Sequence, residues 1–281
     1  MKIAISAEST IDLPKELLEK YQINILPYTI ILGDKEYLDG EEISPKQIFD
    51  YVKETKVLPK TAAINAAQYH DFFEGLLKEN DAVVHICLSS QISSACSHAK
   101  DAASEMDNVF VVDSQSLSTG IALLAIYARQ LADAGVLPDE ICQKVQDRTS
   151  KVQASFVVEK LDYLHKGGRC SAVALLGANL MRIRPQIILK EGKMGIHRKY
   201  RGNMDKVIAS YCKDTLDEFS TPDLEVGFVT YTTATPEMID SAKKALQERG
   251  FKNIYETVAG ATITSHCGEN TLGILYLNDG Q

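Results

Sequence analysis

The first 150 residues alternate short apolar runs with helical patterns, and this alternation limits the folds that the chain can adopt. Apolar runs predict strands in residues 2–10, 23–32, 81–90 and 108–114. Each run is followed by a helical pattern, in residues 16–21, 44–54, 93–106 and 117–135. Strands that are apolar throughout and separated by helices indicate a mostly parallel sheet with helices on both faces.

After about residue 150 the strands become shorter and fewer helices separate them. Strands are predicted in residues 154–159, 184–194, 224–232 and 272–277, and helices in residues 204–219 and 236–250. Short strands with few helices between them are typical of an α+β arrangement. We therefore expect an α/β protein with a mostly parallel, three-layer α/β/α domain in residues 1–150, an α+β domain in residues 151–281, and a ligand between them.

The cysteines and the apolar runs indicate the cellular compartment of the protein. None of the six cysteines forms a CxxC pair, which argues against a zinc cluster or a redox dithiol and favours free thiols in a reducing cytoplasm. The first residues lack the pattern of a signal peptide, and no apolar run reaches the roughly 20 residues that span a bilayer. The sequence also lacks a GxxxxGK[ST] nucleotide loop. We expect a cytoplasmic protein that binds no cofactor.

The charge of the chain is unevenly distributed. A net charge of −8 argues against general nucleic-acid binding, which depends on a basic surface. Residues 165–201 nevertheless contain nine basic residues against one acid, a net charge of +8. The basic residues are Lys166, Arg169, Arg182, Arg184, Lys190, Lys193, Arg198, Lys199 and Arg201. Such a run is either a solvated surface or a docking face for an anionic partner.

Hydroxyl side chains gather where the predicted strands of the first half end. Thr61 closes the segment LPKT, four serines lie within residues 89–94, and three more with Thr119 lie within residues 111–120. Ligands of open parallel sheets collect at the carboxyl ends of strands, where helix N-termini offer free N–H groups. A single serine at such a turn most often caps a helix. From the residues alone, helix capping and ligand binding both stay open.

Six segments appear together in the order LPKT, QYHDFF, LSSQISSACSHA, VVDSQSLSTG, LDYLHKGGRCS and TSHCGENTLGILYL. In this order and spacing the chain resembles the DegV family of fatty-acid carriers over nearly its full length. The resemblance implies a lipid carrier that is not itself an enzyme and that holds a long-chain fatty acid between two domains. It further implies that the carboxylate is presented to a separate ATP-dependent kinase subunit, which makes an acyl phosphate for a phospholipid-synthesis acyltransferase.

The resemblance also assigns residues to the ligand. Thr61, Ser93 and His266 match family positions that bind the carboxylate, and Arg201 resembles a family arginine near the head group. Gly167, Gly168 and Arg169 match its GGR segment, and we expect them, with Arg198 and Lys199, to contact a partner or an anion. The chain departs from the family pattern at Ala62, Ala63, Ile64, Asn65, Ser94, Ala95, Cys267 and Glu269.

Physical chemistry supports these roles. Burying about fifteen methylenes yields on the order of 12 kcal/mol before ordering costs. A buried carboxylate needs charge-assisted hydrogen bonds, which hydroxyls, histidine and arginine supply. The glycines beside Arg169 form either a simple turn or an anion-binding concavity of N–H groups.

Two other functions remain open at this stage. One is a serine esterase or thioesterase with Ser93 as nucleophile and His266 as base, although the sequence has no G-x-S-x-G elbow. The other is a small-molecule sensor. A basic rim in residues 165–201 would steer a kinase partner or allow transient contact with an anionic membrane surface.

Overall fold

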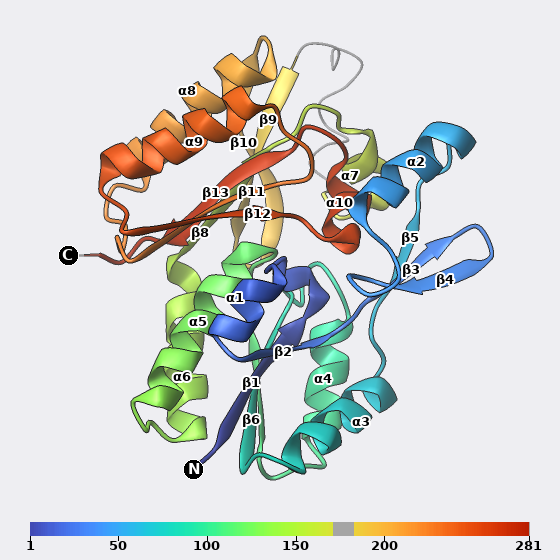
Figure 1. Ribbon diagram of the computed structural model, residues 1–281, viewed down its shortest axis with the longest axis vertical. Helices are drawn as coiled ribbons and strands as arrows, with labels where there is room; N and C mark the ends of the chain where they lie inside the picture. Colours follow the sequence, from blue (N-terminus) through green and yellow to red (C-terminus); the bar gives the residue numbers. More distant parts are fainter. Residues whose placement is uncertain (171–182, 281) are drawn as a thin grey trace.

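The computed structural model describes residues 1–170 and 183–280, and its first sheet is fully parallel (Figure 1). The sheet order is β2-β1-β6-β7. These strands are β1 (Ile3–Glu8), β2 (Ile23–Leu26), β6 (Ala82–Cys87) and β7 (Val109–Asp113). β1 and β6 are buried along their whole length, because helices cover both faces of the sheet.

Two pairs of helices cover this sheet. One face is covered by α3 (Ala66–Leu77) and α4 (Ala95–Ala103), and the other by α5 (Thr119–Asp133) and α6 (Pro138–Arg148). The short helix α1 (Lys15–Lys20) connects β1 to β2. The predicted three-layer α/β/α arrangement of this part of the chain is confirmed.

The second sheet is mixed and has the order β10-β9-β8-β13-β11-β12. Its strands are β8 (Val152–Val157), β9 (Ile183–Lys190), β10 (Lys193–Arg201), β11 (Val226–Tyr231), β12 (Asn253–Val258) and β13 (Leu272–Leu277). All neighbours pair antiparallel except β11 and β12. Helices α8 (Met204–Glu218) and α9 (Pro236–Arg249) pack on this sheet, as expected for an α+β unit.

Helix α5 lies between the two sheets and contacts β1 and β6 of the first as well as β8, β11 and β13 of the second. Its residues from Thr119 to Ile126 are all buried, because a helix between two sheets has no solvent face. One hydrophobic cluster accordingly runs from Val84 and Ile86 to Phe156 and Leu275. The division of the chain at residue 150 therefore stays a prediction, since the core is continuous across it.

The apolar run at residues 23–32, predicted as one strand, forms two strands in two different sheets. β2 ends at Leu26, and β3 (Thr29–Leu32) begins a small antiparallel sheet with β4 (Lys35–Leu38) and β5 (Lys60–Ala62). Pro27 lies between them, where it has no N–H to offer to a strand ladder. The next helix, α2 (Pro45–Thr55), begins as predicted after Ser44, whose backbone N–H donates to the Gln47 side chain at 2.9 Å.

The short helix α10 (Ala261–Cys267) joins the second sheet to the first half of the chain and packs against α2, α7 (Asp162–Gly167), β3 and β5. Two buried carboxylates hold its first turn. Asp12 accepts a hydrogen bond from the Gly260 N–H at 2.8 Å. Asp39 accepts from the N–H groups of Ala261 at 2.8 Å and Thr262 at 3.1 Å. Carboxylates bind well here because the N–H groups of a first turn have no partners within the helix.

The Asp12 carboxylate makes the stability of this joint depend on pH. Burial, together with the nearby Asp39, raises the pKa of Asp12 to about 8, although hydrogen bonds from Ser118 and Gly260 oppose the shift. Because the folded state holds this proton more tightly than the unfolded chain, its contribution to stability is complete below pH 4 and is lost as the pH rises through 8.

We expect Asp12→Asn to gain stability relative to the wild type as the pH rises from 5 to 9. The amide oxygen still accepts from the Gly260 N–H, the amide NH2 group donates to the Ser118 oxygen in place of the present bond, and the amide has no proton to lose. The relative gain should be at least about 1.4 kcal/mol, the value of one pKa unit. Urea unfolding at pH 5, 7 and 9 measures it, with the exposed Asp34→Asn as control. A difference between Asp12→Asn and wild type that stays constant over this range would contradict the pKa assigned to Asp12.

Candidate ligand cavity

A cavity of about 170 Å³ lies beyond the carboxyl ends of β1 and β6, where the strand order of the first sheet reverses. This is the place where open α/β sheets bind ligands. Much of its wall is apolar, with Leu88, Ile92, Leu117, Leu164, Met194 and Ile263 among the lining residues. Its polar side chains include Tyr28, Thr61, Ser93, Ser94, Arg169 and His266. The structure thus gathers Thr61, Ser93 and His266, which lie far apart in the sequence, around one cavity.

Thr61 and His266 contact each other directly. Thr61 Oγ1 on β5 lies 2.9 Å from Nε2 of His266, which is near the end of α10. Burial, with a smaller effect of the Arg169 charge, lowers the pKa of His266 to about 4, so the imidazole is neutral at pH 7. Its other nitrogen, Nδ1, is buried and has no hydrogen-bond partner among the described residues. A neutral ring beside a hydroxyl can both donate and accept hydrogen bonds.

Ser93 combines the two roles that the sequence left open. Its Oγ accepts a hydrogen bond from the N–H of Ala95 at 3.2 Å, at the start of α4, and it also lines the cavity. A second hydrogen bond, at 3.1 Å, comes from the phenol of Tyr28. Tyr28 is not among the site residues expected from the sequence, because it lies within an apolar run that is predicted as one strand. The turn after Pro27 is the signal that would have separated it from that strand.

The GGR segment lies at the opening of the cavity. Gly167 ends α7, and Gly168 caps it with a φ of +70°, in the left-handed region that favours glycine. Arg169 is exposed yet lines the cavity, and its guanidinium donates to the Gly167 carbonyl at 2.6 Å. Gly167 itself is packed against His266, since a Cβ built on it would lie 2.7 Å from Nδ1.

Arg201 is not among the described residues that line the cavity, and its expected place near the head group stays a prediction. Met194 of β10 lines the cavity, and Arg201 lies seven residues further along the same strand. Among the described residues, the cation that lines the cavity is Arg169.

The basic run also does not form one continuous rim over the described residues. Arg198 pairs with Asp214 at 3.3 Å and Glu218 at 2.7 Å, both on α8, which largely neutralises its charge. Lys199 is exposed on the same distal part of β10. Arg184 pairs with Glu159 at 3.3 Å. Arg182 lies outside the described residues. The expectation that Arg169, Arg198 and Lys199 contact a partner stays a prediction, and of these three Arg169 lines the cavity.

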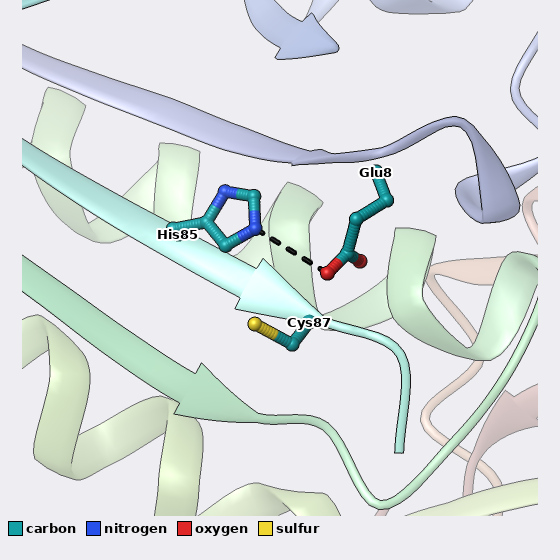
Figure 2. A group of neighbouring side chains, drawn as sticks. All are labelled: Glu8, His85 and Cys87. Carbon is teal, nitrogen blue, oxygen red and sulfur yellow. Dashed lines mark ion pairs between the residues drawn. The ribbon is translucent and has the colours of Figure 1, made fainter. Parts of the chain in front are cut away.

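Beneath the cavity, Glu8, His85 and Cys87 point toward one another from β1 and β6 (Figure 2). Their candidate ligand atoms lie within 4.8 Å of one another, a donor set that suits a transition metal by type. The carboxylate of Glu8, however, accepts hydrogen bonds from the Tyr69 phenol at 2.7 Å and the Leu88 N–H at 2.8 Å. It also faces His85 Nε2 at 3.5 Å.

Burial raises the pKa of the Cys87 thiol well above its usual range, so this sulfur is protonated at pH 7. These contacts are explained by a buried carboxylate that is held by hydrogen bonds. Its bond to the Leu88 N–H fixes one wall of the cavity.

The geometry does not favour the serine hydrolase. A catalytic serine needs its general base within hydrogen-bond reach. In the described residues, the Ser93 hydroxyl bonds to Tyr28 and Ala95, whereas His266 Nε2 bonds to Thr61.

The fold and the cavity define an α/β protein with a largely apolar cavity whose polar side chains come from both halves of the chain. The chain belongs to the DegV family, because the family's model, described as "Uncharacterised protein, DegV family", matches residues 2–279. The resemblance inferred from the sequence is thereby confirmed.

Similar proteins cover the whole chain. A DegV domain-containing protein of Caldanaerobacter subterraneus subsp. tengcongensis is 29% identical over 280 residues, which are 98% of each chain. The solved structure of a DegV family protein from Thermus thermophilus, described with its fatty acid binding, is 25% identical with a TM-score of 0.91. DegV of Bacillus subtilis, described as a fatty acid binding protein, is 28% identical with a TM-score of 0.87. Each of these two matches covers 99% of this chain and 99% of the solved chain. No described helix is long and apolar enough to cross a bilayer.

We expect Gly167→Ala to displace the His266 ring, since the added methyl group would lie 2.7 Å from Nδ1. The displaced imidazole gains contact with water, so its pKa should rise from about 4 toward 6.5. An NMR titration of the histidine ring signals, with His266→Gln for assignment, measures this change. Gly195→Ala is the matched control, because a methyl group there meets nothing within 4 Å. A pKa that stays near 4 in Gly167→Ala would show that the packing does not hold the ring.

Proposed function

We propose that this protein binds a long-chain fatty acid in the cavity, with the carboxylate at Thr61, Ser93 and His266. The observation that supports this most is the gathering of these three side chains, from three separate segments, at one apolar cavity. The Thermus thermophilus and Bacillus subtilis proteins with the same fold are described as binding fatty acids. Two hydroxyls and an imidazole suit a carboxylate, which accepts hydrogen bonds only.

The charged side chain of this site, Arg169, lies toward solvent. Neutral donors lie within the cavity, and Arg169 is exposed at its opening. An incoming carboxylate is attracted by the guanidinium and then exchanges its water for the oriented side chains. The carboxylate also favours the protonated form of His266, so its arrival raises the pKa of this imidazole.

The tail continues toward a second, smaller cavity of about 30 Å³. Leu117, Ile263 and Cys267 line both cavities, and Phe156 and Leu275 add apolar surface to the second. Ligand cavities usually measure roughly 300–1,000 Å³. The walls must therefore move apart along this path to accept a long tail, and the burial of about 0.8 kcal/mol per methylene favours that opening.

We expect the double variant Thr61→Ala and Ser93→Ala to bind hexadecanoic acid about 100-fold more weakly. Two hydrogen bonds to a charged group are lost, each worth roughly 1.5 kcal/mol or more. Titration of delipidated protein measures the affinity, and native mass spectrometry of protein purified from cells identifies a co-purified ligand. The matched control is Thr55→Ala with Ser104→Ala, both exposed. An unchanged affinity in the first pair removes these hydroxyls from the site.

We further propose that the bound carboxylate is presented at the Arg169 opening to a separate ATP-dependent kinase subunit. The acyl phosphate formed there would pass to an acyltransferase of phospholipid synthesis. Support for this step comes from the position of an exposed cation beside the polar end of the cavity, where an anionic partner surface is attracted.

We expect Arg169→Glu to slow acyl phosphate formation at low salt, with the difference from wild type shrinking as salt screens the charges. The rate is measured with the kinase subunit at saturating fatty acid, and fatty-acid affinity is determined separately for each variant. Lys199→Glu makes the same charge change on the distal part of β10 and should leave the rate unchanged. Equal slowing by both variants would mean that overall charge matters and that the opening does not.

A further inference from the structure

We propose that Tyr28 is a positioning residue for the carboxylate: its phenol fixes the Ser93 hydroxyl so that the Ser93 proton points into the cavity. This inference rests on the proposed fatty-acid binding and adds a residue that lies outside the six segments on which the family resemblance rests. The assignment follows from the directions of the hydrogen bonds around Ser93 and from the rigid placement of Tyr28.

The Ser93 oxygen has both of its acceptor positions occupied. The phenol of Tyr28 donates to Oγ at 3.1 Å, and the Ala95 N–H donates to it at 3.2 Å. A hydroxyl oxygen has two lone pairs and one proton. Because both lone pairs are used, the remaining function of Ser93 is to donate its proton. No described residue accepts that proton in a hydrogen bond, and Ser93 lines the cavity.

Tyr28 is held firmly enough to impose this direction. Its side chain is 2% exposed and lines the same cavity. Its backbone N–H donates to Ser9 Oγ at 3.0 Å, and its carbonyl accepts from the Asp39 N–H at 2.9 Å. The residue lies between β2 and β3, next to Pro27, whose φ is fixed by its ring. Burial raises the pKa of the Tyr28 phenol well above its usual range, with the nearby Glu8 carboxylate adding to the effect. The phenol therefore stays protonated and acts as a donor.

An oriented donor selects the head group of the ligand. A carboxylate only accepts hydrogen bonds and carries a charge, so it gains most from a hydroxyl that is already aimed at it. An alcohol of equal length both donates and accepts, and it can pair with Ser93 in either rotamer. Without the Tyr28 phenol, the Ser93 hydroxyl is free to rotate and to accept from the ligand. The preference for acid over alcohol should then fall.

The test is a double-mutant cycle of Tyr28→Phe, Ser93→Ala and the double variant, titrated with hexadecanoic acid and with hexadecan-1-ol. Tyr28→Phe keeps the ring and should weaken acid binding about 5-fold while changing alcohol binding less than 2-fold. In the Ser93→Ala background, Tyr28→Phe should cost nothing further, because Tyr28 acts through Ser93. Additive losses for the acid, or equal losses for both ligands, overturn the proposal.

The control variant is Tyr276→Phe. Its phenol is also buried and donates to a neutral oxygen, the Phe219 carbonyl at 3.0 Å, but it packs in the core beneath α8 and α9. Removing the Tyr276 hydroxyl should lower the stability of the protein about as much as removing the Tyr28 hydroxyl, but it changes no residue of the cavity. Tyr276→Phe should therefore leave the ratio of acid to alcohol affinity unchanged. A change of that ratio as large as in Tyr28→Phe would attribute the effect to general destabilisation and overturn the positioning role.

A ligand-free measurement separates this proposal from the proposed function. The Raman difference spectrum of wild type minus Tyr28→Phe reports whether the Tyr28 phenol donates a hydrogen bond. We expect the spectrum to show that the Tyr28 phenol donates a hydrogen bond, and we expect this signal to be lost when Ser93 is replaced by alanine. If wild type lacks the signal, the hydrogen bond from Tyr28 to Ser93 is absent and the proposal is overturned. If wild type binds no hexadecanoic acid, fatty-acid binding fails and the positioning role fails with it. If wild type binds the acid and the cycle is additive, only the role of Tyr28 fails.

Discussion

The Asp39 carboxylate is the interaction on which the arrangement of the cavity depends. It accepts hydrogen bonds from the first N–H groups of α10 and from the Ser9 hydroxyl after β1. The Asp39 N–H also binds the Tyr28 carbonyl. A seven-residue helix has little stability of its own, so α10 keeps its direction through such contacts. His266 near its end faces Thr61 only while this joint holds, and one buried carboxylate thus places residues from both ends of the chain.

The sequence predicted the elements whose burial is uniform. Strands β1 and β6 are buried along their whole length, and α5 is buried from Thr119 to Ile126, so their apolar runs identify them well. It did not predict α10, whose seven residues include three hydroxyl side chains and a histidine, or β12, which is largely exposed at a sheet edge. Both owe their structure to tertiary contacts. The division of the run at Pro27 was also missed, because apolar residues continue on both sides of it.

The cavity residues could be grouped from the sequence only through family resemblance. Thr61 and His266 are separated by 205 positions and meet because β5 and α10 pack together, which no local pattern encodes. Tyr28 was missed because it belongs to no motif, and its proposed role follows from its hydrogen bonds alone.

The cavity relies more on oriented neutral groups than on charge. His266 is neutral because burial lowers the pKa of its imidazole, and Arg169 at the opening already binds the Gly167 carbonyl. Buried charges require large desolvation energies unless they are paired, whereas hydroxyls fixed by neighbouring hydrogen bonds need little reorganisation to receive an anion. Under the proposed function, the ligand's carboxylate brings the charge, and it raises the pKa of His266 by favouring the protonated imidazole.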